Sequence, residues 1–368
     1  MIVEVVVFIL ILGFLIFIHE FFHFLAAKRA NIKVEEFGFG LPPRIFGKKI
    51  GETIYSINLL PFGGFVRLYG EDRYQEVEKK RSFVFQRPLV KSKILLAGVT
   101  ANFLLAVVIF YIVLAVNQFE TYLPSLFGQK FLFGEENQYI TIGYVAEGSP
   151  AQKAGLKVYD LIISANNQKF GSLEEFIEFI NQNKGQKVIL EVRNLREENQ
   201  RRVEIIPREN PPEGQGPLGI QIAPVAHLQY QSLSQKIFSG FLHSLNLLDY
   251  SFRVFGRLIK LSFEEETIQP VAEAVSGPVG IFFLVETTLK EGIIALLSLV
   301  GLLSLSLGVI NILPIPGTDG GRLIFVLYEA LFRKPVPEKI ERNFNLAGYI
   351  FLILLLLLIT FKDIKQFF

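Results

Sequence analysis

The 368-residue chain contains no cysteine. Disulfide bonds, a thiolate nucleophile and a zinc ion held by cysteine are therefore excluded. Histidine is also scarce, and its four copies are His19, His23, His227 and His243. Any transition metal bound by this chain must therefore take its ligands from these imidazoles and from carboxylates.

Charge is sparse as well. Charged residues make up 20% of the sequence and hydrophobic residues 51%, with a net charge of +2. Such a chain is too apolar for an ordinary soluble enzyme and too charged to lie wholly in lipid. We expect a membrane protein with a soluble part. No basic cluster interleaved with aromatic residues is present, so the sequence does not indicate binding to nucleic acid.

Four apolar stretches are long enough to predict transmembrane helices. The first contains only Glu4 as a charged residue before position 19. A cleaved signal peptide is the alternative, but it requires a basic start and a shorter apolar part. The predicted spans cover residues 1–27, 94–116, 293–332, with a break rich in proline and glycine after residue 313, and 346–361.

Basic residues are concentrated between the first two predicted spans and again near residues 333–342. Lysine and arginine are enriched in cytoplasmic loops of membrane proteins. The pattern therefore predicts that these segments lie inside the cell and that the chain between the second and third spans lies outside. The C-terminal half of the first span is then close to the cytoplasmic face.

Residues 28–93 contain short apolar segments separated by glycine and proline, notably at 37–43 and 53–67. They predict a cytoplasmic β-hairpin region that dips into the membrane, because irregular backbone is tolerated at that depth where it lines a protein cavity. The alternative is a surface hairpin that covers the ends of the helices.

Residues 139–225 have the mixed pattern of a soluble α/β domain. Ser172 and Glu175 predict a capping box at the start of an amphipathic helix. We expect its inner face to carry Leu173, Phe176, Ile177 and Ile180. Residues 232–263 then predict an amphipathic helical segment that is too charged to span and lies at the outer interface or packs on the helices.

The sequence His19-Glu20-Phe21-Phe22-His23 lies within the first apolar stretch. Histidines four residues apart share one helix face and can reach a single zinc ion, while the glutamate between them can act as a base. The alternative is that both histidines bond to backbone and Glu20 pairs with a basic residue. Ionisable groups at mid-membrane cost about 2.5–3.5 kcal/mol, which favours a functional site.

The third zinc ligand must come from the other two histidines or from a carboxylate. His227 lies just after the predicted outer domain and His243 lies within the amphipathic segment that follows, on the side of the membrane opposite the motif. We therefore expect both to be surface histidines rather than ligands.

Three carboxylates are predicted at membrane depth, Glu4, Glu20 and Asp319. Glu4 lies ~22 Å from His19 along the helix, so it cannot converge on the metal. Glu20 is needed as the base. Asp319 remains, on the broken segment that follows the inward third span. The alternative for Asp319 is an N-terminal cap of the helix that begins at Gly320, and the two roles are compatible.

Asn311 lies just before this break. Its amide is a candidate for holding the substrate backbone or an oxyanion, and a hydrogen bond between helices is the alternative. A zinc site with two histidines, an aspartate and a glutamate base predicts peptide hydrolysis. The apolar hairpin region is a candidate for binding the substrate as an added strand.

These motifs resemble those of the site-2 protease family, specifically the bacterial RseP type of intramembrane zinc metalloprotease. The matching segments are 19–23, Asn311-Ile312-Leu313-Pro314-Ile315-Pro316 with Asp319-Gly320-Gly321, Pro61-Phe62-Gly63-Gly64-Phe65-Val66 and Ser276-Gly277-Pro278-Val279. The resemblance implies that His19, His23 and Asp319 bind Zn²⁺ and that Glu20 is the catalytic base. Phe62, Gly63 and Gly64 are, with Asn311, candidates for substrate or oxyanion contacts.

Residues 148–156 and Leu218-Gly219-Ile220 resemble parts of a circularly permuted PDZ domain, and the latter are candidates for its peptide-binding groove. The resemblance therefore implies a multi-pass α-helical protein of the bacterial cytoplasmic membrane with one extracytoplasmic PDZ domain. Its substrates would be transmembrane proteins already trimmed by a site-1-type protease, such as anti-sigma factors or remnant signal peptides. Val99, Tyr159 and Arg322 depart from the usual family residues.

Two other functions are compatible with parts of the sequence. A non-catalytic membrane PDZ scaffold would keep the groove, but it has no need of Glu20 between paired histidines. An ion transporter would explain charges within the membrane, but it would typically show repeated halves, which the sequence lacks.

Overall fold

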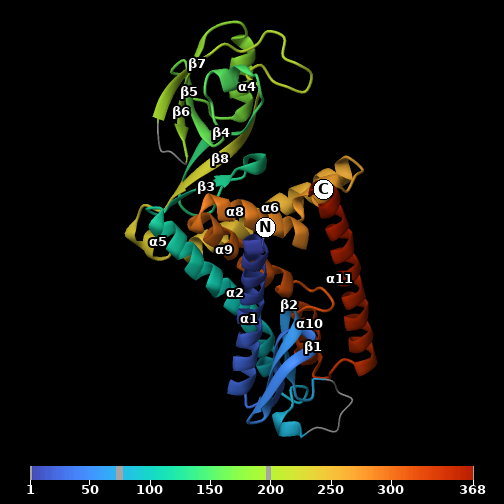
Figure 1. Ribbon diagram of the computed structural model, residues 1–368. Helices are drawn as coiled ribbons and strands as arrows, with labels where there is room; N and C mark the ends of the chain where they lie inside the picture. Colours follow the sequence, from blue (N-terminus) through green and yellow to red (C-terminus); the bar gives the residue numbers. More distant parts are fainter. Residues whose placement is uncertain (1, 72–77, 196–199, 368) are drawn as a thin grey trace. The chain divides into compact units, whose positions relative to one another are not determined.

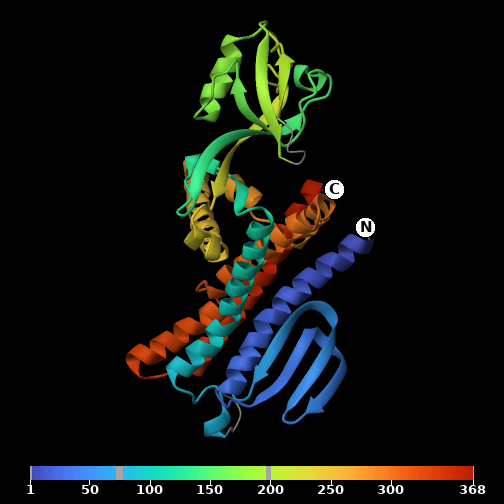
Figure 2. The same ribbon diagram turned by 90° about the vertical axis from the view of Figure 1, so that its left-hand side faces the viewer.

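The computed structural model describes residues 2–71, 78–195 and 200–367, which form two compact units. We call residues 1–113 with 258–368 the helical unit and residues 114–257 the insert unit. Figures 1 and 2 show the elements of both, and each unit is described by itself below.

Four helices of the described chain are long and apolar enough to cross a membrane. They agree with the four predicted spans, although the last helix begins before residue 346 because the polar residues at its start are helical too. The helices are α1 (Ile2–Arg29), α2 (Pro88–Val116), α9 (Ile293–Ile312) and α11 (Glu338–Phe367).

The spans pack through complementary apolar and small side chains. Leu15 of α1, Ile109 of α2 and Val300 of α9 belong to one buried cluster. The hydroxyl of Ser304 in α9 donates a 2.8 Å hydrogen bond to the carbonyl oxygen of Asn102 in α2. Small residues let helix backbones approach closely in this way. The packing fixes α2 and α9 side by side next to α1.

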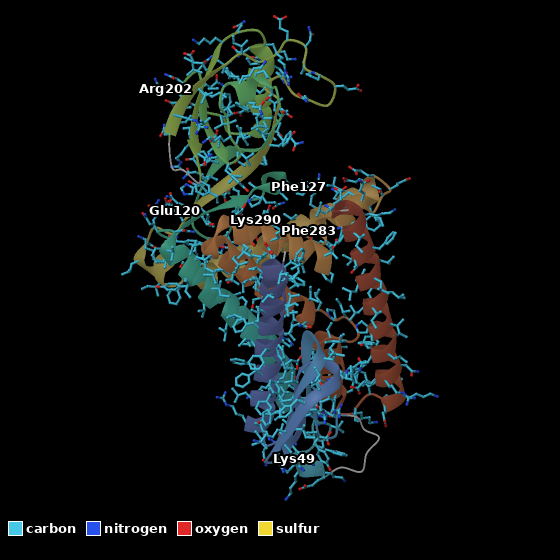
Figure 3. All side chains as sticks on the ribbon, viewed as in Figure 1. Lys49, Glu120, Phe127, Arg202, Phe283 and Lys290 are labelled. Carbon is cyan, nitrogen blue, oxygen red and sulfur yellow. The ribbon has the colours of Figure 1, made fainter. Side chains whose placement is uncertain are left out.

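Shorter helices join the spans. They are α7 (Gln269–Ala274), α8 (Pro278–Glu291), which carries the labelled Phe283 and Lys290 of Figure 3, and α10 (Asp319–Phe332). Asp363 of α11 is buried, and its Oδ2 accepts hydrogen bonds from the backbone N–H groups of Gly277 (2.9 Å) and Gly280 (2.8 Å). The Ser276-Gly277-Pro278 segment is thus the start of α8, held by a carboxylate near the end of the chain.

The break after α9 ends at Thr318, which is the N-cap of α10. Its Oγ1 accepts a 3.3 Å hydrogen bond from the N–H of Gly321. The alternative interpretation of Asp319 as the cap is therefore wrong. A threonine already satisfies the helix end, so the Asp319 side chain is available for other contacts.

The hairpin region consists of β1 (Val34–Ile50) and β2 (Thr53–Leu68) beside α1 (Figure 2), with Lys49 near its turn (Figure 3). Residues 36–39 pair with 64–67 and also with 54–57, while 44–50 pair with 53–58. Each strand therefore folds back midway, and 64–67 lie at an edge. No other strand of the described chain pairs with that edge.

The insert unit is built on a six-stranded antiparallel sheet of order β3-β8-β4-β5-β6-β7. Helix α4 covers its core through Phe176 and Ile180. The elements are β3 (Glu120–Pro124), β4 (Glu135–Val145), α3 (Pro150–Lys153), β5 (Asp160–Ala165), α4 (Leu173–Gln182), β6 (Val188–Asn194), β7 (Gln200–Ile205) and β8 (Ile220–Gln229).

The start of α4 differs from the predicted capping box. Ser172 Oγ accepts a hydrogen bond from the Glu175 N–H, as expected, but the Glu175 carboxylate accepts from the N–H of Gly171 instead of Ser172. Ile177, predicted to face the core, is 44% exposed. It borders a groove instead, because it lies at the edge of the apolar face.

After the sheet come α5 (Leu233–Ile237) and α6 (Ser239–Glu264). His243 is buried, with Nδ1 3.2 Å from the Tyr230 hydroxyl, and burial lowers its pKa to about 4. His227 is buried as well, stacked on Tyr122. The prediction of two surface histidines is wrong, because both fill aromatic clusters that the sequence pattern does not reveal.

Candidate metal centre

The centre forms where α10 meets α1. His19 and His23 lie one helical turn apart on the buried face of α1, and Asp319 is the first residue of α10. Asp319 Oδ2 is 3.0 Å from His19 Nε2 and 3.1 Å from His23 Nε2, and the two Nε2 atoms are 3.1 Å apart. Among the described residues this is the group of histidine and carboxylate side chains that can hold a metal.

The donor set fits zinc. Ligands that each lie 2.0–2.1 Å from one tetrahedral ion are about 3.3 Å apart, close to the separations found here. Two imidazoles and one carboxylate are three protein ligands, the number that leaves a fourth position open in catalytic zinc sites.

Two contacts from α2 orient the imidazoles. His23 Nδ1 donates a 2.7 Å hydrogen bond to the carbonyl oxygen of Ile94, which leaves Nε2 free to bind metal. Asn102 Nδ2 lies 3.1 Å from His19 Nδ1, while Asn102 Oδ1 is buried without a hydrogen-bond partner in the described part of the chain. Rotating this amide by 180° would satisfy Oδ1 with the His19 Nδ1–H and direct the Nε2 lone pair to the metal.

Gly98 allows α2 to approach the histidines. A Cβ atom at this position would lie 2.4 Å from His23 Nε2 and 2.7 Å from His19 Cε1. Atoms without a bond between them pack no closer than about 3.5 Å when both are carbon-like in size. The site therefore requires glycine here.

Glu20 lies on the neighbouring face of α1, against the hairpin. A Cβ at Gly64 of β2 would be 3.2 Å from Glu20 Cγ. The Glu20 side chain lines the same cavity, of about 570 Å³, as His23 and Asp319. Phe65 and Arg67 of β2 line it too. The arrangement places a carboxylate and a strand edge next to the metal ligands.

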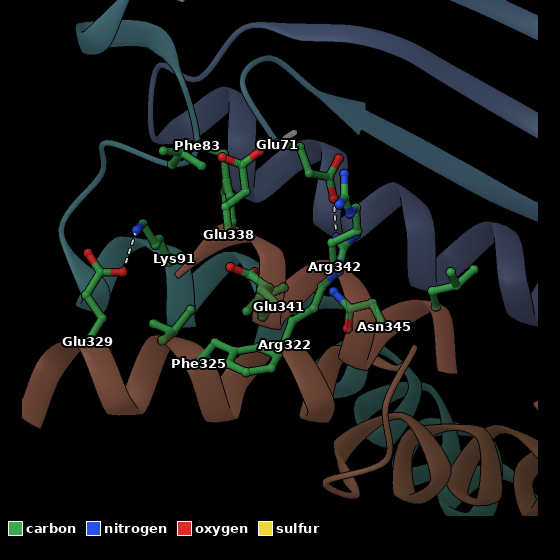
Figure 4. A pocket seen from close by; sticks show the side chains of 14 residues that line it. Glu71, Phe83, Lys91, Arg322, Phe325, Glu329, Glu338, Glu341, Arg342 and Asn345 are labelled. Carbon is green, nitrogen blue, oxygen red and sulfur yellow. Dashed lines mark hydrogen bonds and ion pairs between the residues drawn. The ribbon is translucent and has the colours of Figure 1, made fainter. Parts of the chain in front are cut away.

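A second cavity of about 460 Å³ shares Glu71, Leu95, Arg322 and Asn345 with the first. Figure 4 shows its charged lining, where Lys91 Nζ of α2 lies 2.8 Å from Glu329 Oε2 of α10. Glu71, which follows β2, pairs with Arg322 of α10. Polar side chains thus continue from the metal centre along α10 toward the start of α11.

Asn311 and the hairpin glycines belong to the helical unit. Asn311 is half-buried at the end of α9, and its amide makes no hydrogen bond to another described residue. The structure therefore gives no support to an interhelical bond through it. Gly63 and Gly64 lie on β2, whereas the side chains of Pro61 and Phe62 lie outside the part of the chain described.

The predicted groove residues lie in the insert unit. Leu218 and Ile220 border an apolar groove of about 190 Å³ between α4 and β8, which is also lined by Phe176 and Ile177. Gly219, between them, has a left-handed backbone with φ of +72°. The lining of this groove is mainly apolar, and its use in peptide binding stays a prediction.

Sequence reasoning missed Gly98, Asn102 and the Ile94 carbonyl as parts of the centre. An amide in the middle of an apolar span was a usable signal for Asn102, since polar groups at membrane depth are rarely without a role. The roles of Gly98 and of a backbone carbonyl depend on helix packing and carry no signal of their own.

Known proteins share this sequence organisation. A protein of Clostridium perfringens named "Putative zinc metalloprotease CPE1693" is 32% identical over 350 residues, covering 95% of each chain. The "Zinc metalloprotease RasP" of Oceanobacillus iheyensis is 27% identical over 443 residues, covering 99% of each. The PDZ domain of an SdrC-like protein from Listeria innocua matches with 28% identity, over 23% of this chain and 92% of that one, with a TM-score of 0.20.

Residues 7–355 match the family described as Peptidase family M50. This match covers nearly the whole chain, including His19, Glu20, His23 and Asp319. The chain belongs to peptidase family M50, the site-2 proteases, and is a zinc metalloprotease of the membrane.

Proposed function

We propose that the protein hydrolyses peptide bonds within transmembrane segments of membrane proteins that another protease has already shortened. The observation that carries this proposal is the convergence of His19, His23 and Asp319 beside Glu20. These groups come from a long apolar helix and from the helix that follows a proline-broken span.

His19, His23 and Asp319 would hold the zinc ion through two Nε2 atoms and one carboxylate oxygen. Bound zinc supplies a Lewis acid, which lowers the pKa of water toward ~7 and polarises a scissile carbonyl. Ile94 and Asn102 hold the imidazole rings in the orientation that this requires.

Glu20 would act as the general base. Its carboxylate lines the cavity with two of the proposed ligands but forms no hydrogen bond to another described residue that would occupy it. This position supports the proposal that Glu20 takes a proton from the attacking water and delivers it to the leaving amine.

The substrate would bind as a strand along residues 64–67 of β2. This edge is not paired within the described chain, and Gly64 lies against Glu20. A transmembrane helix must unwind before cleavage, and strand addition would hold it open through backbone hydrogen bonds. Phe62 and Gly63 extend this edge, and Asn311 is proposed to hold the substrate backbone or the oxyanion.

The charge pattern supports an orientation in the bacterial cytoplasmic membrane. The C-terminal end of α1 and the N-terminal ends of α2 and α11 lie at the same end of the helical unit (Figure 1). Their basic residues support the proposal that this end, with the metal centre near it, lies at the cytoplasmic face. The insert unit, which we propose to be a PDZ domain, would then lie outside the cell.

The proposed outer domain would select substrates through the groove at Leu218, Gly219 and Ile220. Shortened anti-sigma factors and remnant signal peptides are the substrate classes that we propose. Both would depend on an earlier cut by a site-1-type protease.

The test uses the purified full chain in detergent, its zinc content and a transmembrane peptide substrate. Glu20→Gln should abolish cleavage and keep about one bound zinc, because the change removes the base but no ligand. Asp319→Ala should lose both cleavage and bound zinc, whereas His227→Ala should keep both. Near wild-type cleavage by the Glu20→Gln protein would disprove the proposed mechanism.

A further inference from the structure

The pair formed by Glu71 and Arg322 joins α10, which carries Asp319, to the segment that follows β2. Arg322 lies one turn after Asp319 in α10, and Glu71 lies three residues after the end of β2. The Arg322 guanidinium donates a hydrogen bond to Glu71 Oε1. Both side chains line the cavity that contains Glu20, His23 and Asp319.

Glu71 is itself bound to the strand. Its Oε2 accepts a 3.2 Å hydrogen bond from the N–H of Leu68, the last residue of β2, and its own N–H donates to the Leu68 carbonyl oxygen at 3.1 Å. Leu68 is buried and belongs to the cluster of Ile32, Val34 and Ile94. One carboxylate therefore bridges a fixed strand end and the helix that carries Asp319.

The first turn of α10 is fixed by hydrogen bonds and close packing. Arg322 N–H donates to the carbonyl oxygen of Thr318 at 3.2 Å, within the capped first turn. A Cβ at Gly320 would lie 2.2 Å from the carbonyl oxygen of Leu313, so the turn packs tightly on the preceding loop. A displacement of Arg322 is thus passed to Asp319 through a rigid turn.

We propose that Arg322 and Glu71 are positioning residues that align Asp319 with the substrate-binding edge of β2. The role of β2 in this proposal rests on the proposed function. The effect of the Arg322–Glu71 pair on Asp319 rests only on the contacts described above. The Glu71 side chain is 19% exposed and that of Arg322 42%, so the pair acts less as a buried charge pair than as a link between the end of β2 and α10, which the loss of either partner removes. Removing a direct hydrogen-bond partner of a metal ligand typically changes metal affinity 10–100-fold, and this pair acts one step further away, through the first turn of α10, so we expect an effect at the lower end of that range.

The experiment is a double-mutant cycle in the full-length protein with Glu71→Gln, Arg322→Gln and both together. Zinc affinity is measured by competition with a chelator, and ligand geometry by the visible absorption spectrum after Co²⁺ substitution. Each single change should lower zinc affinity about 10-fold and alter the Co²⁺ spectrum. The double change should be no worse than either single change, because both remove the same interaction.

The cleavage rate gives the second readout. Each single change should lower kcat about 10-fold and change KM little, because the link sets alignment more than binding. Arg322→Lys should keep at least half of kcat, since a lysine can preserve the single contact to Oε1. Glu52→Gln is the matched control, because it breaks the hairpin's pairs with Lys28 and Arg81 without touching α10. It should change none of these values.

Wild-type zinc affinity and Co²⁺ spectra in both single variants would overturn the proposal, as would losses that multiply in the double variant. Effects equal to those of Glu52→Gln would also overturn it. The metal measurements do not depend on catalysis, so they remain decisive even if the Glu20→Gln test disproves the proposed peptidase mechanism. Melting temperatures identify any variant that is merely unfolded, and Arg322→Lys then provides the test.

Discussion

Replacing Gly98 by alanine should disable the metal centre while leaving the helices folded. The new methyl group would start 2.4 Å from His23 Nε2. This is about 1 Å closer than ordinary contact. His23 has little room to move away, because its Nδ1 is hydrogen-bonded to the carbonyl oxygen of Ile94, which lies one turn before Gly98 in α2. The imidazole must rotate or the two helices must separate.

A displacement of about 1 Å at a catalytic group can cost about 100-fold in rate, which corresponds to about 2.7 kcal/mol of transition-state stabilisation. We expect at least this loss of kcat/KM for Gly98→Ala, together with 10–100-fold weaker zinc binding. Alanine favours helix over glycine by about 1 kcal/mol, so the melting temperature need not fall in parallel.

The assay is zinc content and cleavage of a transmembrane peptide by the purified protein. Gly256→Ala is the control, because Gly256 also lies within a helix but has open space where a Cβ would be. It should keep full activity and gain slightly in stability. Full zinc occupancy and wild-type kcat/KM in Gly98→Ala would refute the close packing of α2 on the histidines.

Two further results are expected. Burial lowers the pKa of His243 to about 4. As the pH falls below about 6.5, His243 is therefore protonated in the unfolded chain but stays neutral in the folded chain. Stability should therefore fall by about 3 kcal/mol as the pH drops from 6.5 to 4, and urea unfolding of His243→Gln should lack this component. Single cysteines at Lys80 and Lys334 of this cysteine-free chain should resist an impermeant maleimide on intact cells, whereas one at Lys184 should react. Labelling at Lys80 alone would reverse the proposed orientation.

The spans and the first two metal ligands could be predicted because their signals are local. A long apolar run sets a helix, and the spacing of His19 and His23 sets their common face. Asp319 followed from elimination, since few carboxylates lie at membrane depth. The structure then brings these three side chains together across almost the whole chain length.

The remaining parts depend on which surfaces meet. Asn102 and Gly98 contact the histidines only because α2 packs beside α1, and no periodicity in either helix records that contact. His243 looked like a polar residue on a partly charged helix, yet tertiary packing gives it the Tyr230 hydroxyl as a partner. The Glu175 carboxylate accepts from the N–H of Gly171, one residue before the N-cap, and the residue types that define a capping box do not distinguish this partner from Ser172.

The carboxylate of Asp363 has a consequence for the order in which the protein is made. It holds the first N–H groups of α8, some eighty residues earlier in the chain, yet it belongs to the last turns of the last helix. Chains are synthesised from the N-terminus, and early segments begin to fold first. The start of α8 therefore stays without these hydrogen bonds until residue 363 of α11 has been synthesised. Helix α11 therefore completes the helical unit, because the start of α8 reaches its final arrangement only when α11 packs against it.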